Sequence, residues 1–142
     1  MANAERVIEV VDHLGLSGPR REFAVFGGAC LALNGIREAH DLDLFATKRV
    51  SRRLKSEGWR TERFSNGQNP HLLGSVLGLE VQIFSSWECI GWQPDIHGYI
   101  NDPEITLGVP CMPLGDLMEW KLYTARPKDL RDLALVDHWR ED

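Results

Sequence analysis

The sequence predicts an α+β fold in which a small mixed β-sheet has helices packed on one side. Two observations lead to this expectation. Short apolar or alternating runs, typical of strands, are interleaved with helical runs up to about residue 84, and the chain then ends in two helical runs. The length of 142 residues also matches one domain, so we predict a single domain over residues 1–142.

The first predicted elements are a helix, a buried strand and a second helix. Residues 3–14 place apolar side chains at helical spacing, and Phe23–Phe26 is a short apolar run that suits a buried strand. Gly27-Gly28 follows as a turn, after which residues 29–33 are good helix formers and Asn34-Gly35 ends the helix. Because the first N–H groups of a helix bind anions, this turn is a candidate phosphate site.

The next strand, Asp41–Phe45, alternates polar and apolar residues. Asp41 and Asp43 should therefore project together, while Leu42 and Leu44 project the other way, into a core. Two neighbouring carboxylates repel each other and lose hydration when buried. A hard divalent cation such as Mg²⁺ relieves both problems, because it prefers carboxylate oxygens.

The rest of the chain is predicted to contain a basic helix, three strands, an irregular segment, an edge strand and two helices. In order, these are Thr47–Glu57, Trp59–Phe64, a short strand over Leu72-Leu73 and Val76-Leu77, Leu79–Phe84, Ser85–Thr106, Val109–Met112, Pro113–Ala125 and a helix from Pro127. We expect the apolar side chains of the last two helices to pack inward: Leu114, Leu117, Met118 and Leu122, then Leu130, Leu133, Ala134 and Val136.

Two charged features stand out in these later elements. Residues 48–63 hold seven Lys and Arg against two acids, which indicates either a solvated helix face or a surface for an anionic partner such as RNA. Glu80 is an acid within an otherwise apolar strand, so it needs a partner or a metal ion.

The glycine turn and the acids together resemble a known family. Gly27-Gly28, twelve further residues, then Asp41-x-Asp43, with Arg37 shortly before the acids, are similar to the core motif of the nucleotidyltransferases of the polymerase-beta superfamily. The resemblance is to the small bacterial and archaeal branch, which includes antibiotic nucleotidyltransferases and nucleotidyltransferases of toxin–antitoxin systems. It covers roughly residues 23 to 135.

The resemblance implies transfer of a nucleoside monophosphate from an NTP, with ATP the expected donor, to the hydroxyl of a protein, RNA or small molecule. Pyrophosphate would leave. Asp41 and Asp43 would hold Mg²⁺, or Mn²⁺, and Glu80 would complete a metal site or accept the acceptor's proton. The Gly27 and Gly28 backbone would take the phosphates.

Four further charged residues are candidates for binding or structural roles. Arg37 is either a phosphate ligand or an anchor for the Asp41–Phe45 strand, and Lys121 is either a phosphate contact or a solvent-facing helix lysine. Asp129 and Asp132, in the stretch Arg126-x-Lys-Asp-x-x-Asp-Leu, are expected to tie the last two helices together through Arg126 or Arg131.

Composition limits the other classes of function. A net charge of −5 argues against broad nucleic-acid affinity, and three widely spaced cysteines suit a reducing cytoplasm. We expect no membrane span or signal peptide. A protein partner or a homo-oligomer could supply acceptor-binding surface. The alternative function is a non-catalytic nucleotide-binding or partner-binding module, such as a toxin–antitoxin component.

Overall fold

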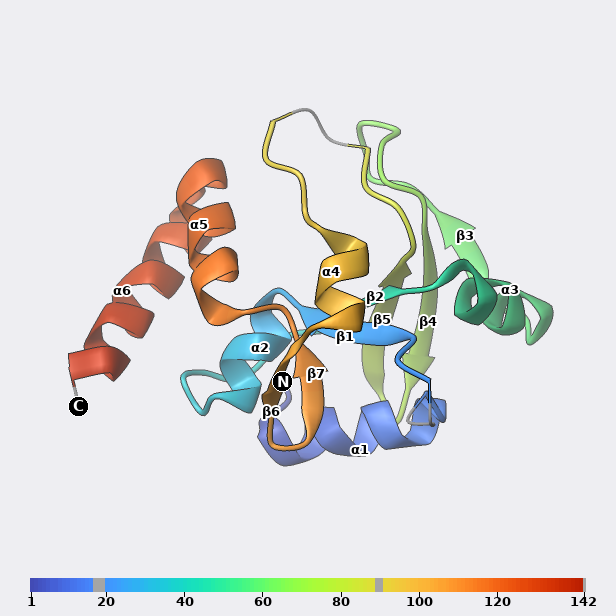
Figure 1. The fold of residues 1–142 in the computed structure, drawn as a ribbon, viewed down its shortest axis with the longest axis horizontal. Coiled ribbons are helices and arrows are strands. Elements are labelled where there is room, and N and C mark those ends of the chain that lie inside the picture. Colours follow the sequence, from blue (N-terminus) through green and yellow to red (C-terminus); the bar gives the residue numbers. More distant parts are fainter. Residues whose placement is uncertain (17–19, 89–90, 142) are drawn as a thin grey trace.

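The structure is a computed structural model that describes residues 1–16, 20–88 and 91–141 (Figure 1). Over these residues one seven-stranded mixed sheet, in the order β3-β4-β5-β2-β1-β7-β6, is combined with six helices, which confirms the α+β fold class. Within the same residues, no helix has both the length and the apolar character needed to cross a bilayer.

The strands are β1 (Phe23–Phe26), β2 (Leu42–Ala46), β3 (Arg60–Glu62), β4 (His71–Val76), β5 (Leu79–Phe84), β6 (Glu104–Thr106) and β7 (Val109–Cys111). The helices are α1 (Ala4–Leu14), α2 (Gly28–Leu33), α3 (Lys48–Ser56), α4 (Ile96–Asn101), α5 (Leu114–Thr124) and α6 (Pro127–Glu141).

The centre of the sheet places the predicted acids beside the glycine turn. β1 and β2 are antiparallel, with Phe26 opposite Asp43, so Gly27 begins its turn next to that carboxylate. β2 and β5 are parallel, with Asp43 opposite Gln82. Three segments that are separate in sequence therefore meet at one end of the central strands.

The two faces of the sheet are covered differently. Leu42 and Leu44 are fully buried, as predicted, on the face that α1 and α2 cover. Phe45, on the opposite face with Asp43, stacks on Tyr99 of α4 with ring centroids 6.1 Å apart. Figure 1 shows α1 and α4 on opposite sides of β1, so α4 adds partial cover to the face opposite the helix layer.

Several predicted boundaries need correction. The segment 85–106, expected to be irregular, contains α4 and β6, and Cys89 lies outside the described residues. Asp95 caps α4 by accepting a hydrogen bond from the Gly98 N–H, a local signal that the predominance of Trp, Pro and Gly had obscured. The short strand predicted over Leu72-Leu73 and Val76-Leu77 is β4, which begins at His71 and ends at Val76.

The prediction that Leu122 and Leu130 pack inward is wrong. Their exposed fractions are 65% and 51%, and Ala134 is also exposed. The buried residues of α6 are Asp129, Asp132 and Val136. An inward stripe of acids is stable here because each carboxylate meets cations from neighbouring segments, as described below.

Candidate functional site

A cleft with a volume of about 560 Å³ lies between the central strands and the α5–α6 hairpin. It is lined by six of the seven predicted site residues, which are Gly27, Gly28, Arg37, Asp41, Asp43 and Lys121. Its volume is within the range of small-molecule sites. The structure therefore brings together residues that the sequence had linked only by spacing.

Both glycines of the turn lie close to side chains of the cleft. Gly27 has a φ of +71°, which favours glycine, and a Cβ there would lie 3.2 Å from Asp43 Oδ2. A Cβ on Gly28 would lie 2.9 Å from Arg37 Nη2. The guanidinium of Arg37 thus occupies the space into which a larger side chain at position 28 would project.

The protein does not fully stabilise the charged form of the Asp43 side chain. Its Oδ1 is buried and has no hydrogen-bond partner within the described structure. Burial, followed by the negative charges of Asp41 and Glu80, raises the pKa of Asp43 from 3.8 to about 8, although Lys128 and Lys121 oppose this rise. A cation bound between Asp41 and Asp43 would supply the missing partner and favour the ionised form.

The donor atoms at this point suit Mg²⁺ or Mn²⁺, but the protein supplies few of them. Among the described residues, no three His, Cys, Asp or Glu side chains lie close enough to hold one ion. Asp41 and Asp43 therefore form a partial site. Mg²⁺ is commonly bound in this way, through one or two carboxylates together with substrate phosphates and water.

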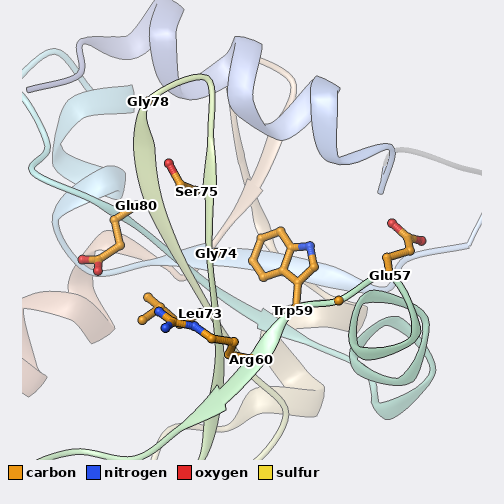
Figure 2. A pocket seen from close by; sticks show the side chains of 9 residues that line it. Glu57, Trp59, Arg60, Leu73, Gly74, Ser75, Gly78 and Glu80 are labelled. Carbon is orange, nitrogen blue, oxygen red and sulfur yellow. The ribbon is translucent and has the colours of Figure 1, made fainter.

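Glu80 lies near the acids but outside the cleft. It shares a face of β5 with Gln82, which lines the cleft opposite Asp43. Figure 2 shows Glu80 in a second depression of about 690 Å³, which Trp59 and Arg60 also line. Its role as a third metal ligand or a base stays a prediction. Sequence analysis missed Gln82, although the alternation of β5 places it beside Glu80.

Arg37 is tied to the far wall of the cleft. Its Nε and Nη2 donate to the two carboxylate oxygens of Asp132, at 2.7 and 2.9 Å, and its Nη1 donates to the carbonyl of Glu38. Such a two-point contact fixes the orientation of the guanidinium. These contacts tie Arg37 to α6, so its role as a phosphate ligand or as an anchor for the Asp41–Phe45 strand stays a prediction, and Asp132 pairs with Arg37 rather than with Arg131.

Lys121 is buried rather than solvent-facing, with an exposed fraction of 9%. Its Nζ lies 2.9 Å from Asp132 Oδ2 and 3.5 Å from Asp129 Oδ1. Asp129 also accepts from Arg126 Nε at 2.7 Å, so the predicted tie through Arg126 is present.

The pKa values of this second acid pair move in the opposite direction from that of Asp43. Burial alone would raise the pKa of Asp129, but hydrogen bonds from Arg126 and Thr124 outweigh it and hold the pKa well below its ordinary value. For Asp132, hydrogen bonds from Arg37 and Lys121 outweigh burial and lower the pKa. Both acids are therefore ionised and satisfied by the protein itself.

Stacked aromatic rings form the floor between the two walls. Phe26 stacks on both Phe45 and Trp120, at centroid distances of 3.9 and 5.6 Å. Trp92 stacks on Trp120 at 4.9 Å, and Trp87 meets Trp120 edge-on at 4.8 Å. This cluster packs α5 against the sheet.

Comparisons with known proteins support the fold. No protein-family model matches the chain, and no curated protein matches it. A solved structure of a candidate nucleotidyltransferase from Thermotoga maritima aligns with 100% of this chain and 97% of its own, at a TM-score of 0.63 and 18% identity. The antibiotic-resistance factor ANT(2'')-Ia aligns with 91% of this chain and 77% of its own, at a TM-score of 0.48 and 16% identity. The chain has a nucleotidyltransferase-like fold.

Proposed function

We propose that the protein is a metal-dependent nucleotidyltransferase that moves a nucleoside monophosphate from an NTP to a hydroxyl acceptor. One observation carries the proposal most strongly. Asp43 holds a buried oxygen without a partner, next to Asp41 and against Gly27, in a nucleotidyltransferase-like fold. This arrangement leaves a carboxylate oxygen without a partner, and a metal ion bound to the triphosphate would supply one.

Asp41 and Asp43 would hold the metal, Mg²⁺ or Mn²⁺, with the remaining ligands supplied by phosphate and water. When bound, the metal would stabilise charge on the attacking and leaving oxygens. The backbone N–H groups of Gly27 and Gly28 would bind the phosphates at this turn. The protein's contribution would be to position the reactants and to complement their charge.

In the proposed reaction, the acceptor oxygen bonds to the α-phosphorus while the bond from that phosphorus to the bridging oxygen of the β-phosphate breaks. Pyrophosphate leaves with the bonding electrons. The hydroxyl proton passes to Glu80 or to water. Glu80 suits this role because its side chain is exposed beside the acids and lines the second depression, where we propose that the acceptor lies.

In this proposal the acceptor hydroxyl belongs to a protein, an RNA or a small molecule, and ATP is the expected donor. A protein partner or a second copy of the chain would add surface around the open depression at Glu80. The alternative is a module that binds nucleotide or a partner and transfers nothing, such as a toxin–antitoxin component.

Labelled nucleotide transfer separates the two functions. The protein is incubated with each NTP, labelled at the α-phosphate, with Mg²⁺ or Mn²⁺ and a cell lysate as the acceptor source. Label that becomes nuclease-sensitive, protease-sensitive or resistant to both identifies an RNA, protein or small-molecule acceptor. Label that stays in NTP under every condition, although NTP binds, supports the non-catalytic module.

Calorimetry tests the metal requirement independently of turnover. We expect NTP to bind more tightly with Mg²⁺ than with EDTA, because the triphosphate supplies metal ligands that the protein lacks. Equal affinity in the two titrations would contradict a metal site at Asp41 and Asp43.

A further inference from the structure

Five Lys and Arg side chains line the cleft: Arg37, Lys121, Arg126, Lys128 and Arg131. Three of them already have partners. Arg37 and Lys121 contact Asp132 at 2.7 and 2.9 Å, and Arg126 contacts Asp129 at 2.7 Å. An incoming phosphate would have to compete with these carboxylates for the same donors.

Lys128 and Arg131 differ from the other three. Both are exposed, and neither takes part in a hydrogen bond or ion pair within the described part of the chain. They are three residues apart on α6, so their side chains lie on the same face of the helix. That face borders the cleft, since both residues line it together with Leu135 one turn further along.

Lys128 and Arg131 also share the cleft with the acid pair. They line it from α6, whereas Asp41 and Asp43 line it from the central strands on the opposite wall. A free cation therefore lies across the cleft from the carboxylates. A polyphosphate held by a metal at Asp41 and Asp43 would carry charge toward this position.

We propose that Lys128 and Arg131 form an anion-binding edge that contacts the polyphosphate of the nucleotide donor. This inference rests on the proposed function for the identity of its ligand. A lysine supplies a mobile point charge, and an arginine can bind phosphate oxygens at two points. Lys121, whose role as a phosphate contact stays a prediction, also contacts Asp129 and Asp132, and Asp132 holds the guanidinium of Arg37.

The test measures binding of inorganic tripolyphosphate by calorimetry, with and without Mg²⁺, so that neither a base nor turnover is required. We expect Lys128→Ala to weaken binding by roughly 10- to 100-fold, because it removes a charge-assisted hydrogen bond. Arg131→Ala should weaken binding in the same direction, and Lys128→Arg should retain most of the affinity. Since Lys128 is exposed, the variants should unfold at the wild-type temperature.

Lys48→Ala is the matched control. Lys48 is an exposed cation on α3 that does not line the cleft, and its loss changes the net charge equally. Equal weakening in Lys48→Ala and Lys128→Ala would overturn the inference, because only the overall charge would then matter. Wild-type protein that binds no tripolyphosphate, or Lys128→Ala with wild-type affinity, would also overturn it.

The inference and the proposed function can fail separately. Tripolyphosphate binding that depends on Lys128, without transfer of label to any acceptor, keeps the anion-binding edge and refutes the transferase. Transfer at the wild-type rate and with the wild-type NTP affinity in Lys128→Ala keeps the transferase and refutes the edge.

Discussion

On the sheet wall of the cleft, Asp43 has a buried oxygen without a hydrogen-bond partner and a pKa raised to about 8 by burial and by Asp41. On the helical wall, Asp132 is also buried, yet Arg37 and Lys121 lower its pKa. Burial is common to both acids, so the supply of cations makes the difference. The sheet wall is where we propose that a metal ion binds, whereas the acids of the helical wall already have cation partners.

The largest expected effect comes from a change on the sheet wall, where Asp43 has an oxygen without a hydrogen-bond partner. Asp43→Asn should reduce nucleotide transfer by about 10³-fold or more, because a metal ligand that supplies several kcal/mol of charge stabilisation is lost. At about pH 8 and above, the metal-free variant should be at least as stable as the wild type, since it lacks the carboxyl group that burial makes costly to ionise. Transfer assays and urea unfolding in EDTA check the two parts. A variant that keeps the wild-type transfer rate would show that Asp43 is not a metal ligand needed for transfer.

Glu80→Gln tests the third predicted acid. If Glu80 acts as a base, turnover should fall by roughly 10²–10⁴-fold while metal and NTP affinity stay unchanged. If Glu80 is a metal ligand, high Mg²⁺ or Mn²⁺ should restore the rate. Turnover is measured across a metal titration, with Asp41→Asn as an inactive control. Wild-type turnover at every metal concentration would remove Glu80 from the site.

On the helical wall, Asp132→Ala should destabilise the protein by about 3–5 kcal/mol, because it leaves Arg37 and Lys121 without their shared carboxylate. Urea unfolding gives the change in the free energy of unfolding. Asp137→Ala on the exposed side of α6 is the control and should stay within about 0.5 kcal/mol of the wild type. A loss of less than about 1 kcal/mol at Asp132 would show that its ion pairs behave as surface pairs.

The two acids should also give opposite pH dependences. The folded pKa of Asp43 lies above its ordinary value of 3.8, so the unfolded chain releases this proton more readily, and stability should fall as pH rises from about 4 to about 8. The folded pKa of Asp132 is lowered, so its contribution is present above 3.8 and is lost as pH falls below that value. Unfolding midpoints in EDTA at about pH 5 and about pH 8 should differ less in Asp43→Asn than in the wild type.

The smallest expected effect comes from a change at Gly28, where the two walls of the cleft meet. Gly28→Ala places a Cβ 2.9 Å from Arg37 Nη2, so the guanidinium must shift from Asp132, and we expect a loss of about 1–2 kcal/mol. Gly115→Ala on α5 is the matched control, because its Cβ meets nothing within 4 Å and should be neutral or stabilising. Equal unfolding midpoints in the two variants would show that position 28 is not crowded.

What the sequence predicted well was local. Alternation placed Asp41 and Asp43 beside a buried pair of leucines, and the glycines preceded them by a spacing that the fold closes into one site. The helical wall escaped prediction because Arg37 and Asp132 are 95 residues apart, and no periodic pattern relates them. The rule that apolar side chains pack inward then failed for Leu130, since acids with cation partners fill the inward stripe of α6.

The aromatic floor also gives the cleft an optical reporter. Of five tryptophans, Trp87 and Trp120 line the cleft, and Trp92 stacks on Trp120 at a centroid distance of 4.9 Å. Indole emission responds to nearby charge and to water, so a phosphate or metal ion that enters between the two walls alters the fluorescence of rings that are already in place. Ligand entry is thus observable in the unlabelled protein, and a Trp120→Phe variant identifies the ring that reports it.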